Sequence, residues 1–123
     1  MKKSVLIIED EDALRRALEV TFRNRDFNVS YASNGEEGLA KSLKEHPDMI
    51  LLDIVMPKMD GLTMLKKLRE DSWGHGAPVI VLTNLSTSEK VEETLEQGAF
   101  DFLVKTDWDL HDIVEKVNQR LKK

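Results

Sequence analysis

The sequence predicts an α/β domain in which a parallel sheet is covered by helices on both faces. Short apolar runs alternate with longer segments whose apolar residues recur at helical spacing. The expected strands are Val5–Ile8, Phe27–Ala32, Met49–Leu52, Val79–Leu82 and Phe100–Val104. Each strand is followed by one expected helix, and such crossover connections make consecutive strands parallel.

The polarity of the strands predicts their order. Val5–Ile8, Met49–Leu52 and Val79–Leu82 are continuously apolar, as expected of strands buried on both faces. Phe27–Ala32 and Phe100–Val104 interleave polar residues, as expected of edge strands. This pattern gives the order 2-1-3-4-5, a five-stranded, flavodoxin-like doubly wound sheet whose switch point lies between the first and third strands.

Apolar periodicity and local signals mark the helices. The residues expected on buried helical faces are Leu14, Ala17, Leu18, Thr21 and Phe22; Leu39 and Leu43; Leu62, Leu65 and Leu68; Val91 and Leu95; and Leu110, Ile113, Val114, Val117 and Leu121. Asp12 and Asn34 are the expected N-caps of the first two helices. Ser86-x-x-Glu89 predicts a capping box for the fourth helix, with Gly98 as its left-handed end.

Composition limits the class of protein. The 123 residues predict a single domain, 1–123, and leave open whether it is complete or part of a longer protein. The absence of cysteine excludes disulfides and thiolate sites. No signal peptide or membrane-spanning run is present, so a cytoplasmic location is expected. The net charge of -5 argues against direct nucleic-acid binding. The histidines are scattered, which favours surface positions over metal binding.

Carboxylates follow two of the central strands, at the point where each strand ends. Glu9 and Asp10 come directly after Val5–Ile8, and Asp53 comes directly after Met49–Leu52. Because the predicted order makes these strands neighbours, we expect the side chains to crowd one pocket at the carboxyl edge of the sheet. Like charges so close are unfavourable without a cation. An all-oxygen site with room for water suits Mg²⁺, which is therefore the predicted cofactor.

Thr83 and Lys105 come directly after the fourth and fifth expected strands, at the same edge of the sheet. Taken singly, Asp53 is an ordinary turn residue, Thr83 a β-branched strand end and Lys105 a solvated lysine. Taken together with the acidic pair, they fit a phosphoacceptor site. In such a site a carboxylate attacks a phosphoryl group, while a metal and a fixed cation or hydrogen-bond donor neutralise the phosphoryl oxygens.

Five sequence blocks resemble one known family, the receiver domain of two-component response regulators. The blocks are Ile7-Ile8-Glu9-Asp10, Leu51-Leu52-Asp53, Met56-Pro57-x-x-Asp60-Gly61, Val81-Leu82-Thr83 and Gly98-Ala99-x-Asp101-Phe102-Leu103-Val104-Lys105. The separations between the blocks also match the family. Any one block is a weak signal, but the set is highly specific and extends throughout the chain.

The resemblance implies a role for each matching residue. Asp53 would accept the phosphoryl group. Asp10, Asp53 and the Val55 carbonyl would bind Mg²⁺ directly, and Glu9 would bind it through water. Lys105 and Thr83 would contact phosphoryl oxygens, and Phe102 would be the aromatic switch residue that turns inward as Thr83 moves.

The resemblance also implies partners. The donor would be a sensor histidine kinase, a phosphotransfer protein or a small phosphodonor. A downstream output protein or domain would bind the face formed by the fourth helix, fifth strand and fifth helix, and activation would be compatible with homodimerisation. The domain would not be a turnover enzyme, although it would undergo Mg²⁺-dependent self-phosphorylation and slow self-dephosphorylation at Asp53.

The chain departs from the family pattern near the site. Thr106 follows Lys105 where the family has proline after a cis bond, and a non-proline cis bond costs about 2.5–4 kcal/mol. Asn84 stands where the family has a small residue, which predicts narrower access for the phosphodonor. Val55 and Leu85 offer no side-chain donor to position an attacking water, which predicts slow loss of the phosphoryl group.

Three alternatives remain open from the sequence. Asp10-x-Asp12 resembles the nucleophile motif of aspartate-dependent phosphatases, with Asp10 as nucleophile, although Leu14 occupies the threonine position of that motif. A flavin or nucleotide module of the same fold is disfavoured because the acidic run 9–12 would repel phosphate. A pseudo-receiver that only binds partners is disfavoured by the intact acidic, threonine and lysine positions, whereas Thr106 supports it.

Overall fold

The computed structural model describes residues 2–54, 56, 58–83, 96–98, 101–104 and 109–121. Its sheet has five parallel strands in the order β2-β1-β3-β4-β5, as predicted from strand polarity. The strands are β1 (Ser4–Ile8), β2 (Asn28–Ala32), β3 (Met49–Leu52), β4 (Val79–Thr83) and β5 (Asp101–Val104). The helices are α1 (Asp12–Asn24), α2 (Gly35–Glu45), α3 (Gly61–Arg69), α5 (Leu110–Leu121) and the short 3₁₀ helix η1 (Gly74–Gly76).

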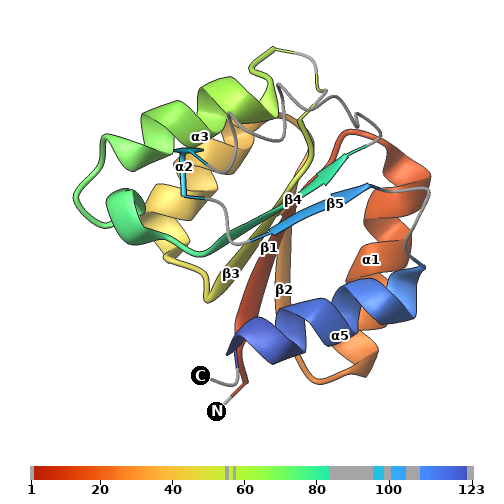
Figure 1. Cartoon of the computed structure of the whole chain (residues 1–123). Helices are drawn as coiled ribbons and strands as arrows, with labels where there is room; N and C mark the ends of the chain where they lie inside the picture. The colour runs from red at the N-terminus through yellow and green to blue at the C-terminus, as the bar shows by residue number, and fades with distance from the viewer. Residues whose placement is uncertain are drawn as a thin grey trace.

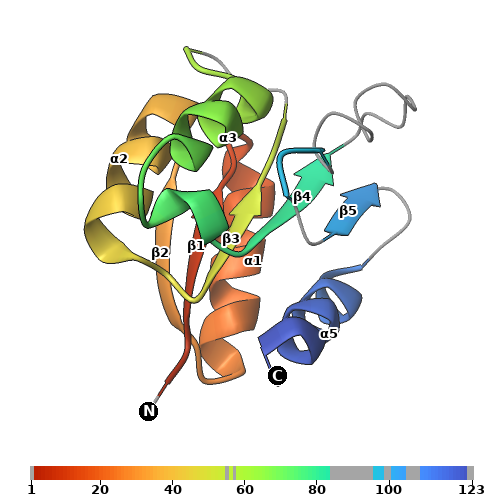
Figure 2. The same ribbon diagram turned by 60° about the vertical axis from the view of Figure 1, so that its left-hand side comes forward.

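The helices cover both faces of the sheet. Figure 1 shows α1 and α5 on one face and α2 and α3 on the other. In Figure 2 the arrowheads of β3, β4 and β5 point toward the same end of the sheet, as the parallel pairing requires. None of the helices in the described ranges has the length and apolar content needed to span a membrane.

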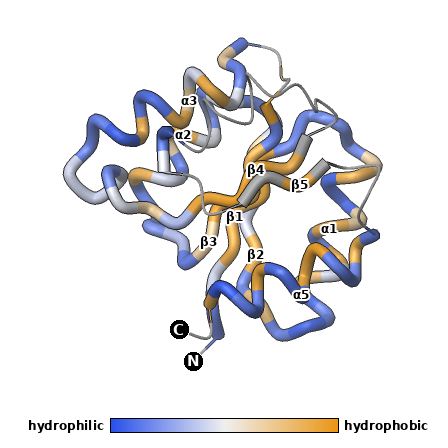
Figure 3. Tube along the Cα trace, viewed as in Figure 1, coloured by the Kyte–Doolittle hydropathy of each residue, from blue (hydrophilic) through white to orange (hydrophobic). Residues whose placement is uncertain are grey.

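The two sides of the sheet carry separate cores. Leu6 and Ile8 of β1 belong to the core under α2 and α3, whereas Val5 and Ile7 belong to the core under α1 and α5. This division follows from the alternation of side chains along a strand. Figure 3 shows the hydrophobic central strands of the sheet and the mixed polarity of the surrounding helices. The continuously apolar strands are therefore the ones buried on both faces.

The buried face of α2 is made by small residues, which differs from the prediction. Leu43 was expected beside Leu39 on the buried face, but it is 36% exposed. Gly35, Gly38 and Ser42 are the buried residues of this helix. The Ser42 hydroxyl donates to the Gly38 carbonyl, so its polar group is satisfied within the helix. The apolar spacing predicted buried leucines. The small residues instead allow α2 to pack closely against the Ile8 side chain, which a Cβ on Gly38 would meet.

The helix caps match the predictions only in part. Asn34 caps α2 as predicted, because its side chain accepts a hydrogen bond from the Glu37 backbone N–H at 2.8 Å. The prediction for Asp12 is wrong, since the N-cap of α1 is Glu11 and Asp12 is the first helical residue. The Asp12 carboxylate instead pairs with Arg15 at 2.7 Å. Charge pairing within the first turn has taken the place of capping.

The Arg69 guanidinium joins the connection after α3 to residues 97 and 98. It donates to the carbonyls of Gly74 (2.7 Å), Ala77 (2.8 Å), Gln97 (2.5 Å) and Gly98 (3.2 Å). Partial burial lowers the pKa of this guanidinium, because desolvation disfavours the charged form. Backbone carbonyls therefore supply the polar surroundings that solvent would otherwise give.

Two other local predictions have different outcomes. Gly98 has a φ of 80°, the left-handed conformation predicted for it. The other features predicted for the fourth helix, namely Val91, Leu95 and the box from Ser86 to Glu89, lie outside the described residues. The connection between α3 and β4 contains the single turn of η1.

We expect Arg69→Met to lower the free energy of unfolding by about 1–3 kcal/mol, because hydrogen bonds to a charged donor are lost while the aliphatic stem is kept. Urea unfolding measures this change. Lys67→Met, an exposed change on the same helix, is the matched control. Equal effects of the two substitutions would contradict a stabilising role for the Arg69 contacts.

Candidate functional site

Three carboxylates meet at the carboxyl edge of the sheet, where β1 and β3 lie side by side. Glu9 and Asp10 follow β1, and Asp53 follows β3. Glu9, Asp10 and Asp53 each offer a carboxylate oxygen, and these oxygens lie within 4.8 Å of one another. The predicted convergence of these side chains at the switch point is therefore present in the structure.

Backbone pairing fixes where two of these side chains begin. The Asp53 N–H donates to the Ile8 carbonyl at 3.0 Å, and the Glu9 N–H donates to the Ala32 carbonyl at 3.0 Å. Both residues thus continue the hydrogen-bond ladder one step beyond the last strand residue. Their side-chain positions are consequently set by the register of the sheet rather than by a free loop.

The burial of the cluster is uneven. Glu9 and Asp53 are only 2% and 5% exposed, whereas Asp10 is exposed. Holding ionised carboxylates close together and away from water costs free energy through both desolvation and mutual repulsion. A hard divalent cation relieves both costs, and a carboxylate set with one solvent-exposed member suits a cation that keeps some of its water. The donor chemistry of the cluster therefore fits Mg²⁺.

The Glu9 carboxylate is oriented by the turn that follows it. The Glu11 N–H donates to Glu9 Oε2 at 3.1 Å, and Arg15 Nη1 donates to the Glu9 backbone carbonyl at 3.3 Å. The backbone and one carboxylate oxygen of Glu9 are thus both engaged. This arrangement holds the acidic turn against the start of α1.

The segment after Asp53 is fixed by close backbone approaches at two glycines. The Gly61 N–H donates to the Ile54 carbonyl at 2.8 Å, and the Gly35 N–H donates to the Met59 carbonyl at 3.0 Å. A Cβ on Gly61 would collide with the Asp53 carbonyl oxygen, and one on Gly35 would collide with the Met59 carbonyl oxygen. Only glycine fits at either position without moving the segment that carries Asp53.

Asp60 adds a further constraint by capping α3, since its side chain accepts from the Thr63 N–H at 2.8 Å. From the sequence, Gly61 was predicted only as part of a motif, and no role was predicted for Gly35 or for the Asp60 cap. The contact of Gly35 with Met59 joins segments distant in the sequence, so no local pattern signalled it.

The remaining predicted residues are described only in part. Thr83 is the last residue of β4 and is in register with Val104, and Phe102 is in register with Val81. The Thr83 and Phe102 backbones thus lie in neighbouring strands, and their side chains lie outside the described part of the structure. Val55 and Lys105 also lie outside it. The departures noted at Asn84, Leu85 and Thr106 also fall outside the described residues.

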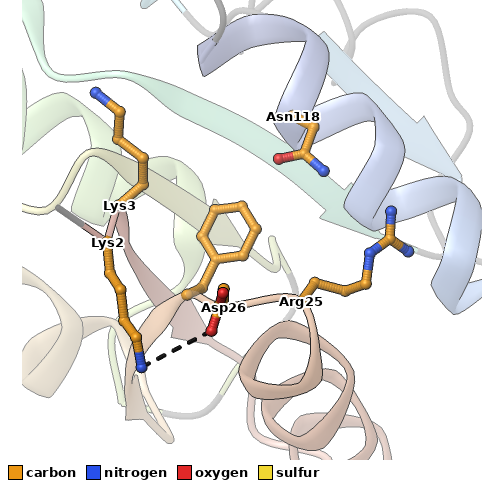
Figure 4. Close-up of a pocket in the computed structure, with 6 residues that line it drawn as sticks. Lys2, Lys3, Arg25, Asp26 and Asn118 are labelled. Atoms are coloured by element: carbon orange, nitrogen blue, oxygen red, sulfur yellow. Dashed lines mark ion pairs between the residues drawn. The ribbon is translucent and has the colours of Figure 1, made fainter.

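A separate hollow of about 450 Å³ lies at the opposite edge of the sheet, beside the start of β1. Figure 4 shows Lys2, Lys3, Arg25, Asp26 and Asn118 around it. Lys2 and Asp26 approach to 4.0 Å, and Arg25 pairs with Glu115 of α5. Several of these charges are therefore engaged with neighbours, and the hollow is remote from the carboxylates.

The histidines and Trp73 lie away from the carboxylates. His46, His75 and His111 are all exposed, as predicted. Trp73 is partly buried and packs against the core under α2 and α3. Its ring stacks on that of His46 with centroids 4.2 Å apart.

Comparisons with known proteins agree with this geometry. The family model of the response regulator receiver domain matches residues 5–118. The regulatory protein AtoC of Escherichia coli is 41% identical over 101 residues, which cover 82% of this chain and 22% of AtoC. The chain spans about half or less of the length of the curated relatives that it matches.

Solved structures show the same fold. A CheY-like receiver domain protein from Methanospirillum hungatei has a TM-score of 0.91 and 27% identity, covering 99% of this chain and 95% of that one. The CheX–CheY–BeF₃–Mg²⁺ complex from Borrelia burgdorferi contains a chain with a TM-score of 0.89 and 32% identity, covering 98% of this chain and 90% of that one. Family, fold and acidic cluster agree, and the chain belongs to the response-regulator receiver domains.

Proposed function

We propose that Asp53 accepts a phosphoryl group from a sensor histidine kinase, a phosphotransfer protein or a small phosphodonor. The observation that carries this proposal is the position of Asp53, which is buried, held by the sheet and within 4.8 Å of Glu9 and Asp10 at the ligand atoms. An acidic cluster of this kind favours a metal-assisted phosphoryl transfer over a role in turn formation alone.

Magnesium is the proposed cofactor. Asp10, Asp53 and the Val55 carbonyl would hold the ion, with Glu9 acting through water. When bound, the ion neutralises negative charge on the phosphoryl oxygens. The relative from Borrelia burgdorferi, whose complex contains BeF₃ and Mg²⁺, supports this assignment.

The chemical step is a displacement at phosphorus. A carboxylate oxygen of Asp53 forms a bond to phosphorus while the bond from phosphorus to the donor's leaving atom breaks. That atom, an imidazole nitrogen of a phosphohistidine or an oxygen of a small phosphodonor, keeps the electron pair. The hydrogen bonds from Gly61 to Ile54 and from Gly35 to Met59 hold the segment after Asp53 during this exchange. Lys105 and Thr83 are the proposed partners of the phosphoryl oxygens.

Signal output is proposed to follow from a change at Thr83 and Phe102. The face formed by the fourth helix, β5 and α5 would then bind an output protein or domain, or a second copy of the chain. The cytoplasmic location and the absence of direct nucleic-acid binding belong to the same proposal. The domain would act as a signalling module, with a single self-phosphorylation event in place of catalytic turnover.

The first test is phosphorylation by acetyl phosphate with Mg²⁺, followed by intact-mass measurement. The wild type is expected to gain one phosphoryl group, and Asp53→Asn is expected to gain none because the nucleophile is gone. Asp60→Asn is the matched control, since asparagine also caps helices. A phosphatase-like protein using Asp10 as nucleophile would instead retain the mass gain in Asp53→Asn.

Magnesium should stabilise the folded domain. Binding to the native state alone adds about 2.7 kcal/mol at a concentration 100 times the dissociation constant. We expect Mg²⁺ to raise the thermal midpoint of the wild type and EDTA to reverse the rise. The thermal midpoint of Asp10→Asn should rise less with Mg²⁺ than that of the wild type. Without metal, this variant should be at least as stable as the wild type, because one of the crowded charges is removed. A wild-type midpoint indifferent to Mg²⁺ would count against the metal site.

The phosphorylated domain should lose its phosphoryl group slowly, over minutes or longer, because Val55 and Leu85 provide no side-chain donor for an attacking water. The decay of the phosphorylated mass after removal of the donor measures this lifetime. Leu85→Gln should shorten it by supplying a donor, whereas Leu85→Met should leave it unchanged. A wild-type lifetime of seconds would refute the prediction.

A further inference from the structure

Arg15 is a buried cation that contacts the backbone of Glu9, a member of the acidic cluster. Its side chain is only 10% exposed. Nη1 donates to the Glu9 backbone carbonyl at 3.3 Å, and Nη2 pairs with the Asp12 carboxylate at 2.7 Å. The guanidinium also lies over the Tyr31 ring, 5.1 Å from its centroid. One side chain thus connects the turn after β1, the first turn of α1 and the edge strand β2.

The contact with Glu9 has a geometric consequence for the cluster. The carbonyl that Arg15 binds belongs to the peptide group between Glu9 and Asp10. The Glu9 N–H on the other side of the residue is held by the Ala32 carbonyl at 3.0 Å. With both backbone groups of Glu9 engaged, the 9–10 peptide plane cannot rotate without breaking a charge-assisted hydrogen bond. The direction in which Asp10 leaves the chain is therefore set partly by Arg15.

The charge of Arg15 is locally balanced. Asp12 lies at 2.7 Å, and Glu19 of α1 lies 4.0 Å from Nε. Glu19 is itself buried and also pairs with Arg23 at 3.5 Å. Because nearby carboxylates offset the guanidinium, its main effect on the cluster is to hold the backbone in place.

Tyr31 limits the movement of the guanidinium from the other side. Its ring has a second cation, Lys41 Nζ, 5.0 Å from the centroid, and the same Nζ donates to the Tyr31 carbonyl. The ring of Tyr31, a residue of β2, is thus also in contact with a lysine of α2. A guanidinium placed over such a ring is held by cation–π attraction as well as by its ion pair.

We infer that Arg15 is a positioning residue for the divalent cation site, which it serves by fixing the Glu9–Asp10 peptide. The inference deepens the proposed function and requires only that the carboxylates bind a cation. Outer contacts that orient metal ligands change metal affinity by about 10- to 100-fold when they are removed. Arg15 would act in this way through the backbone, without touching the ion.

The test is equilibrium titration of the metal-free protein with Mg²⁺, with the dissociation constant measured at a temperature where every variant is folded. Arg15→Met should bind Mg²⁺ about tenfold more weakly than the wild type. Arg15→Lys should be intermediate, because a single ammonium keeps the charge but cannot reach the same set of acceptors. Arg16→Met, an exposed change at the next position, should bind like the wild type.

Thermal unfolding without metal separates positioning from stability. If Arg15→Met and Arg15→Lys are destabilised yet bind Mg²⁺ as tightly as the wild type, Arg15 is merely structural and the inference is overturned. If Arg15→Met does not fold, Tyr31→Leu provides the second variant, and unchanged Mg²⁺ affinity in both Tyr31→Leu and Arg15→Lys also overturns it. A wild type that binds no Mg²⁺ would also overturn the inference.

A different result would contradict the proposed function. A wild type that binds Mg²⁺ but gains no phosphoryl group contradicts Asp53 as phosphoacceptor. Weaker Mg²⁺ binding by Arg15→Met in that protein would still support the positioning role. The two readouts, dissociation constant and mass gain, thus distinguish the two claims.

Discussion

The repulsion among Glu9, Asp10 and Asp53 is the interaction around which the carboxyl edge of the domain is built. Two of these residues are almost fully buried, so the cost of bringing them together has to be met by the rest of the fold. Ladder hydrogen bonds to the Ile8 and Ala32 carbonyls hold them in place, and the apolar strands behind them provide the packing energy. A cluster on flexible loops would move apart instead.

Residues around the cluster hold in place the backbone segments that carry the carboxylates. Gly35 and Gly61 bring neighbouring backbone into contact with the segment after Asp53, and Arg15 binds the carbonyl of Glu9. These residues come from the starts of three helices, α1, α2 and α3. The edge is thus organised by helix starts on both faces of the sheet, as expected where the connections diverge at a switch point.

The sequence was sufficient for the strand order and for the meeting of the carboxylates, because both depend on patterns within single strands: uninterrupted apolar runs, and charges at their ends. It was insufficient where partners are far apart in the chain. The burial of Gly38 and Ser42 in place of Leu43 depends on how closely α2 approaches Ile8. The role of Gly35 likewise depends on its contact with Met59. No local pattern encodes such distances.

The positions of Lys2 and of the end of α5 have a practical consequence. Lys2 and Lys3 line one hollow together with Asn118 of α5, at the end of the sheet where β1 begins, while the carboxylates lie where β1 and β3 finish. A fusion partner, purification tag or surface tether joined before Lys2 or after α5 would therefore lie toward that end of the sheet, away from the carboxylates. The edge that carries the carboxylates would stay accessible, so immobilised protein is suited to measuring the binding of the proposed phosphodonors directly.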